Sequence, residues 1–204
     1  MYNFKTLSLA LGAAVLLFAS SCDKNDDTPE PAVSKLTTKT FNDLDNVATA
    51  TTYFSLATGT QVTGADTASA TKWDLKFKAT SIFVNSGTSG TGTAQAQIVS
   101  STFDGLTEAP SSGYKADATG APAISGWYTY TATTEPQHAI LPVPGKILVI
   151  KTADGKYAKV EILSYYKGNP STTTAAFADL TTRPASRYYT FRYAYQGDGT
   201  TSFK

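Results

Sequence analysis

Three residue types that build many functional sites are almost missing: the 204-residue sequence has one cysteine, one histidine and one methionine. A single cysteine excludes an intramolecular disulfide. A zinc site needs several histidines, cysteines or clustered carboxylates, and none are suitably clustered in this sequence. His138 stands in no motif that pairs it with a nucleophilic serine. Paired carboxylates for glycoside hydrolysis stay open, because two such residues need not be close in sequence. We expect a protein that is not an enzyme.

Runs of positive charge are missing as well. Without Lys5, which lies in the amino-terminal segment described next, the chain has 16 basic and 16 acidic residues and no net charge. Proteins that bind nucleic acid usually carry a basic patch that neutralises phosphates. We therefore expect no nucleic-acid partner.

The amino-terminal segment has the layout of an export signal. Lys5 precedes an apolar run over residues 7–18, which is too short to span a bilayer, and small residues 19–21 lead to Cys22. This pattern predicts a lipoprotein signal peptide over residues 1–21, with Cys22 acylated as the first residue of the mature protein. Acylation would give the lone cysteine a use, and two or more acyl chains anchor a protein stably. The alternative is a plain secretory signal followed by an incidental cysteine.

Residues 22–35 are expected to be the lipidated cysteine and a flexible tether. Residues 23–31 are acidic, contain two prolines and show no apolar period. An acidic stretch directly after the lipidated cysteine also resembles the surface-export signals of some Gram-negative lipoproteins. The resemblance implies an outer-membrane lipoprotein on the cell surface, and a mere spacer is the other interpretation.

Residues 36–204 are predicted to form one all-β domain of antiparallel hairpins. Threonine is frequent, 12 tyrosines and 10 phenylalanines are present, and we find no long amphipathic helix and no internal repeat. Asp154-Gly155 between two apolar runs is a strong hairpin signal. Tyr189, Phe191, Tyr193 and Tyr195 alternate and should share one sheet face. The strands that we expect are 73–78, 81–85, 94–99, 127–131, 147–151, 157–166 and 188–195.

The acidic segment Asn42–Asn46 weakly resembles a calcium-binding loop. It lacks the glycine and the terminal glutamate that such a loop requires. We expect its acids to cap or form turns instead.

Several motifs, in one consistent order along the chain, resemble the HmuY-type lipoproteins. The match runs from about Lys35 to Phe203, and the Ala153–Lys159 hairpin is its most specific piece. The motifs are Trp73-Asp74-Leu75-x-Phe77, the loop 85–90, Gly126-Trp127-Tyr128, residues 149–160, residues 164–167 and residues 189–193.

This resemblance implies an elongated all-β fold and the capture of haem outside the cell. Members take haem from host proteins, pass it to an outer-membrane receptor, and hold the iron between two histidines or two methionines. Here the mature chain has one histidine and no methionine, so neither pair exists within one chain. In the best-known members one iron ligand lies a few residues after the Gly-Trp pair that begins a strand, and in this chain that position falls near Ala132. The other iron ligand lies in a segment before this tryptophan, and that segment is much shortened here.

His138 is one candidate for the haem iron. It follows the Trp127 strand, in the same broad region as a family ligand, and neutral imidazole binds haem iron well. Ligation by His138 alone would give five-coordinate haem. Ligation by His138 of two chains would give six-coordinate haem, held between the subunits of a homodimer. The other interpretation is an exposed loop histidine without a ligand role.

Tyrosine is the other candidate ligand, through Tyr114, Tyr128 and Tyr130. Tyrosinate ligates haem iron in catalase, which requires the phenol to lose its proton to the metal and a nearby base. Tyr128 and Tyr130 are two residues apart on a strand and should face the same side. Ordinary packing of aromatic pairs in a sheet is the alternative.

The leading hypothesis is a surface-anchored lipoprotein that binds haem or a related tetrapyrrole for uptake, with altered iron ligation. Its partners would be the outer-membrane lipid, a haem-carrying host protein and an outer-membrane haem receptor. The rival hypothesis is a lipoprotein of the same fold that recognises a glycan, a peptide or a partner protein.

Overall fold

The computed structural model describes residues 36–47 and 51–204. The predicted signal peptide, Cys22 and the tether lie outside the described residues. No helix in the described part of the chain is long and apolar enough to cross a membrane.

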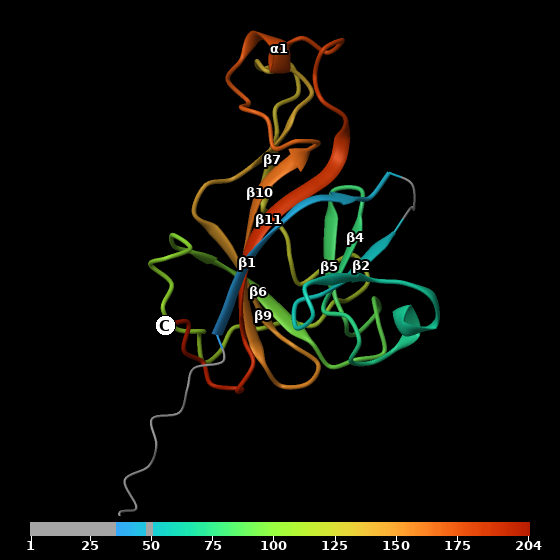
Figure 1. Ribbon diagram of the computed structural model, residues 1–204, viewed down its shortest axis with the longest axis vertical. Coiled ribbons are helices and arrows are strands. Elements are labelled where there is room, and N and C mark those ends of the chain that lie inside the picture. The colour runs from blue at the N-terminus through green and yellow to red at the C-terminus, as the bar shows by residue number, and fades with distance from the viewer. Residues whose placement is uncertain (1–35, 48–50) are drawn as a thin grey trace, which may run out of the picture. The chain divides into compact units, whose positions relative to one another are not determined.

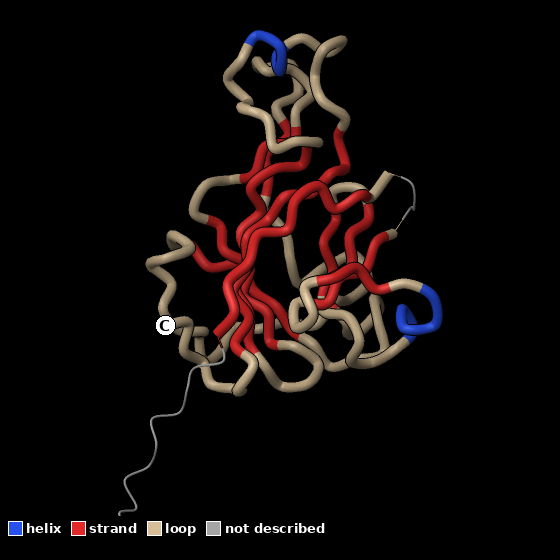
Figure 2. The backbone as a smooth tube through the Cα atoms, viewed as in Figure 1, coloured by secondary structure: helices blue, strands red, loops and turns tan. Residues whose placement is uncertain are grey.

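Eleven strands make up most of the regular structure in this part of the chain, and Figure 2 shows helix only in two short segments. All the strand pairs are antiparallel, as predicted. The elements are β1 Leu36–Asp45, β2 Thr52–Ser55, β3 Thr60–Val62, the 3-10 helix η1 Gly64–Ala68, β4 Leu75–Lys78, β5 Ser81–Val84, β6 Gln95–Ser100, β7 Tyr128–Tyr130, β8 Ile140–Pro142, β9 Lys146–Lys151, β10 Tyr157–Tyr166, α1 Ala175–Ala178 and β11 Ser186–Gln196.

The strands form three sheets (Figure 1). A five-stranded sheet has the order β1-β11-β10-β9-β6, a four-stranded sheet has the order β3-β2-β4-β5, and β7 and β8 form a separate hairpin. The Asp154-Gly155 turn connects β9 to β10 as predicted, with Lys151 paired to Tyr157 and Gly155 at φ +78°. That positive φ is the conformation that glycine adopts without a steric cost.

The main core fills the space between the two larger sheets. Phe77 of β4 packs against Tyr189 of β11 with ring centroids 4.7 Å apart, and Phe54 of β2 meets Phe191 edge-on at 5.1 Å. Tyr189, Phe191 and Tyr193 are buried in this core and Tyr195 packs against it, so the predicted shared face of β11 is confirmed. Aromatic pairs of this kind add to the free energy of area burial.

A second cluster covers the opposite face of the five-stranded sheet. Ile147 and Val149 of β9 pack there against Phe103 and Phe203 from the loops. Lys159 is buried on this face, where its Nζ donates hydrogen bonds to the carbonyls of Phe103 and Leu106. Loop residues between positions 103 and 114 thus cover this face of the sheet.

The sequence interpretation differs from the structure at several strands. Trp73 and Asp74 were expected in a strand but precede β4. Both are buried, and the Asp74 carboxylate accepts the Leu56 backbone N–H at 2.7 Å. Segment 42–46 belongs to β1 and the residue that follows it, and its acids cap backbone groups: Asp45 accepts the Val47 N–H at 2.7 Å and Asp43 the Gly168 N–H at 2.7 Å. Strands β1, β2, β3 and β8 were not predicted.

Candidate functional site

The structure brings two of the predicted site residues into direct contact. Tyr130 ends β7, and its register partner Ile140 begins β8, so the loop between them returns His138 to the tyrosine. The Tyr130 hydroxyl lies 2.6 Å from His138 Nδ1, and the two rings are stacked with centroids 6.1 Å apart. Both side chains are exposed, Tyr130 by 52%. The pair is therefore accessible to a ligand from solvent.

The loop that carries His138 is held by its own hydrogen bonds. Thr131 Oγ1 donates to the Pro136 carbonyl at 2.6 Å and accepts the Ala139 N–H at 2.8 Å. The His138 N–H donates to the Ala132 carbonyl at 2.8 Å, and both residues have left-handed backbones, with φ of +54° and +49°. A side chain on such a braced loop loses little freedom when it binds a ligand.

The chemistry of this pair is that of a phenol beside a base. In the neutral tautomer that carries its proton on Nε2, His138 accepts the Tyr130 hydroxyl proton on Nδ1. A phenol becomes a good iron ligand only after it loses that proton. The contact therefore supplies both groups that tyrosinate ligation requires.

Tyr128 is on the same strand but has a different role in packing. Its ring lies 4.8 Å from that of Trp127, and its hydroxyl donates to Thr80 Oγ1 at 3.3 Å. The side chain is half-buried against the main core. Tyr128 thus supports the base of the hairpin and does not contact His138.

Tyr114 lies elsewhere in the fold. It packs on the second cluster, with its ring 6.3 Å from that of Tyr157. Burial raises the pKa of its hydroxyl to about 12, which disfavours the phenolate form. We therefore leave Tyr114 out of the candidate site, which consists of Tyr130 and His138 with Tyr128 beneath them.

A second segment lies beside the His138 loop. We call residues 130–140 and 171–183 together the tip; Figure 1 shows them in yellow and orange at the same end of the sheet. Glu135 and Pro136 line one side of a cavity of about 280 Å³, and residues 172–174 with Ala178 line the other. Neither segment alone would enclose this space.

Tyr166 of β10 joins the two segments of the tip. Its hydroxyl accepts the Ile140 N–H at 3.0 Å, and its buried ring packs edge-on against Phe177 of α1 at 4.8 Å. Thr174 caps α1 by accepting the Phe177 N–H, and Arg183 donates to the Phe177 carbonyl at 2.7 Å. The polar sequence of residues 171–174 carries no pattern that predicts this junction.

No group of three or more histidine, cysteine, aspartate or glutamate side chains in residues 36–47 and 51–204 lies close enough together to hold a metal ion. Within this part of the chain, a metal would have to be held with fewer protein ligands or arrive inside a cofactor.

A protein-family model, described as HmuY protein, matches residues 48–178. The chain belongs to the HmuY family. A search of curated proteins found none that matches this sequence.

Two solved structures have a similar fold. The apo HmuY analogue of Tannerella forsythia is 14% identical, with a TM-score of 0.56 over 81% of this chain and 98% of that one. Apo PinO from Porphyromonas gingivitis is 13% identical, with a TM-score of 0.50 over 80% of this chain and 98% of that one. The predicted HmuY-like all-β fold is therefore confirmed.

Proposed function

We propose that this HmuY-family protein is a surface-anchored lipoprotein that binds haem or a related tetrapyrrole through Tyr130, with His138 as the base of the tyrosine. The hydrogen bond of 2.6 Å between the Tyr130 hydroxyl and His138 Nδ1 carries this proposal. The iron of a haem would meet a phenolate at Tyr130, while His138 holds the displaced proton. One histidine and one tyrosine then replace a pair of histidines or methionines.

The position of the pair in the hairpin also supports the proposal. Ala132, to which the family resemblance assigns a ligand position, lies in the same loop and accepts the His138 N–H. The apolar plane of a tetrapyrrole needs a surface as well as a ligand. The ring of Tyr128 lies on the strand that carries Tyr130, and Glu135 and Pro136 of the His138 loop line one side of the cavity within the tip. These residues fit a haem cargo held at the surface.

Haem titration of the purified protein, followed by absorbance, tests the proposal. The wild type is expected to give a saturable shift of the Soret band. Tyr130→Phe removes the ligand and should abolish the shift, whereas His138→Ala removes only the base and should weaken binding by about tenfold to a hundredfold. Tyr128→Phe is the matched control, because it removes a hydroxyl two residues away, and it should bind like the wild type.

A direct iron bond to His138 is the competing ligation. In that case His138→Ala would abolish the shift and Tyr130→Phe would keep it. Gel filtration of the haem complex then distinguishes a single-chain site from one shared by a homodimer, since sharing would double the apparent mass.

The membrane anchor is a separate part of the proposal. Cys22 would carry the acyl chains that hold the domain at the outer membrane, where a host haem protein and an outer-membrane receptor are the expected partners. Labelling of cells with a palmitate analogue tests it. The mature protein should carry the label, and Cys22→Ala should not; equal labelling of both would contradict acylation at Cys22.

A further inference from the structure

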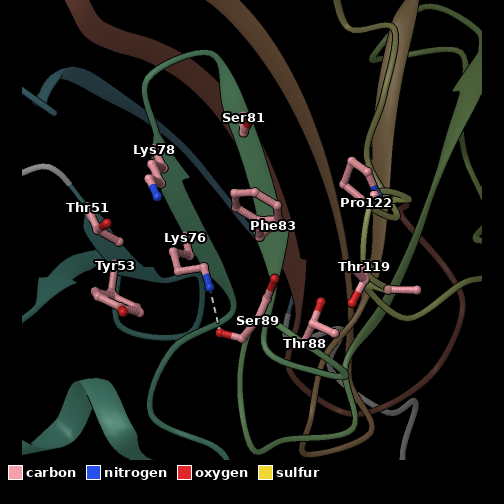
Figure 3. A pocket seen from close by; sticks show the side chains of 12 residues that line it. Thr51, Tyr53, Lys76, Lys78, Ser81, Phe83, Thr88, Ser89, Thr119 and Pro122 are labelled. Atoms are coloured by element: carbon pink, nitrogen blue, oxygen red, sulfur yellow. Dashed lines mark hydrogen bonds between the residues drawn. The ribbon is translucent and has the colours of Figure 1, made fainter.

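A second cavity, separate from the tip, lies on the outward face of the four-stranded sheet. It has a volume of about 530 Å³, within the range of small-molecule sites, and 12 residues line it (Figure 3). The opposite face of β4 carries Leu75 and Phe77, which are completely buried in the main core. The floor of the cavity is therefore fixed by the packing beneath it.

Two lysines project into this cavity from one strand. Lys76 and Lys78 are two residues apart on β4, so their side chains share the outward face. The Lys76 ammonium donates to the Ser89 carbonyl at 2.6 Å and lies 5.0 Å from the centroid of the Phe83 ring. Lys78 is exposed, and in the described part of the chain its ammonium group has no hydrogen-bond or ion-pair partner.

Among residues 36–47 and 51–204, no carboxylate forms an ion pair with Lys76 or Lys78. The residues that line the cavity include no aspartate and no glutamate. The nearby Asp117 is buried and points its carboxylate at the backbone, where it accepts the N–H groups of Val84 at 2.9 Å and Ala123 at 2.8 Å. Burial lowers the pKa of Lys76, the charge of Asp117 opposes this, and the charge of Lys78 adds to it more weakly. Both ammonium groups thus face a cavity without a carboxylate in its walls, where an anionic ligand could pair with them.

The remaining walls combine aromatic rings with hydroxyl groups. Figure 3 shows the rings of Tyr53 and Phe83 on two sides of the lysines, with Thr88 and Thr119 beyond Phe83. Tyr53 is held edge-on against Trp73 at 4.9 Å. Aromatic faces pack against the C–H faces of sugars, and hydroxyls match sugar hydroxyls. Lysine ammonium groups bind carboxylate or sulfate.

From this arrangement we propose that the outward face of the four-stranded sheet binds an acidic oligosaccharide, with Lys76 and Lys78 on its anionic groups and Tyr53 and Phe83 against its rings. The site is formed by β2, β4, β5 and two loops, residues 86–90 and 118–122. It shares no residue with the Tyr130–His138 pair, so an acidic glycan and haem would bind independently.

Calorimetric titration of the whole protein with trigalacturonate, a heparin-derived tetrasaccharide and neutral maltotriose tests this site. At least one acidic oligosaccharide should bind saturably, and maltotriose should not. Added salt should weaken binding, because it screens the lysine charges. Lys76→Gln and Lys78→Gln should each weaken binding by about tenfold. Lys72→Gln is the matched control, since it removes an exposed lysine outside the cavity, and it should bind like the wild type.

Glutamine at position 76 keeps a donor for the Ser89 carbonyl, and circular dichroism checks that the variants are folded. Absence of binding by both acidic oligosaccharides would overturn the proposal. Equal binding of maltotriose would also overturn it, as would unchanged affinity in both lysine variants. Tyr130→Phe should keep full binding of the acidic oligosaccharide. A failure of the oligosaccharide proposal can therefore be distinguished from a failure of the haem proposal.

Discussion

The tip and the four-stranded sheet present the side chains of the two proposed sites in two different ways. At the tip, Tyr130 and His138 stand on a hairpin whose strands have three residues each, and both are exposed. On the sheet, Lys76 alternates with Leu75 and Phe77, which are completely buried. A braced but exposed hairpin suits a cargo that is received from one protein and given to another. A site whose strand is part of the core suits a ligand that meets a preformed surface.

The largest expected effect is a difference in stability between substitutions on the two faces of the four-stranded sheet. Phe77→Ala removes a ring that packs on Tyr189 and Phe191, and should lower the free energy of unfolding by about 3–5 kcal/mol. Phe83→Ala, one strand away on the cavity side, should cost much less stability but weaken binding of the acidic oligosaccharide. Urea denaturation measures the first effect and calorimetry the second. Equal losses of stability in both variants would contradict this division.

Asp74 provides the next largest effect. Its carboxylate accepts the buried Leu56 N–H at 2.7 Å, so Asp74→Ala leaves that donor without an acceptor and should cost about 1–3 kcal/mol. Asp74→Asn keeps an acceptor and should cost less. Urea denaturation of the two variants tests the order, and a smaller loss in Asp74→Ala would contradict it.

Asp74 also predicts a pH dependence of stability. Burial raises the pKa of its carboxyl to about 7 from an ordinary 3.8. Between these values the folded protein binds a proton that the unfolded chain has released, so this residue's contribution to stability is present below pH 3.8 and is lost as pH rises towards 7. Asp74→Asn should remove that decline. Melting curves across this range check it, and an identical decline in the variant would assign it to other groups.

At the tip, Thr131→Val tests how the loop is braced. The change removes the hydrogen bonds to the Pro136 carbonyl and the Ala139 N–H, and should cost about 1 kcal/mol of stability. Haem affinity should fall several-fold, because His138 would no longer be held beside Tyr130. Thr129→Val, on the exposed side of β7, is the control. Unchanged haem affinity in Thr131→Val would mean that the brace does not position the pair.

The smallest effect on stability is expected at the pair itself. Tyr130→Phe and His138→Ala change exposed side chains and should shift the free energy of unfolding by less than about 0.5 kcal/mol. Thermal melting measures this directly. A large loss in either variant would give the pair a structural role.

The strands with strong patterns could be predicted from the sequence. Residues 147–151 and 157–166 carry apolar runs around Asp-Gly, and they form β9 and β10 as expected. Strand β1 was missed, because it lies at the edge of its sheet and half of its side chains are exposed and polar. β3 and β8 have three residues each, too few for a period to be recognised.

The candidate site could be predicted only in its parts. The sequence indicates that Tyr128 and Tyr130 share one side of a strand, and that His138 follows in the same region. It does not indicate that the loop returns His138 Nδ1 to the Tyr130 hydroxyl, since this depends on the hydrogen bonds of Thr131 and on left-handed backbones at Ala132 and His138. The second cavity depends on residues 118–122, which are distant from β4 in sequence.

Resonance Raman spectroscopy of the ferric haem complex, made with ring-deuterated tyrosine, tests the central claim most directly. We predict iron–phenolate vibrations that shift with the label, persist in Tyr128→Phe and disappear in Tyr130→Phe. A haem complex whose spectrum has no label-sensitive iron–ligand bands, or keeps them in Tyr130→Phe, would contradict ligation by Tyr130.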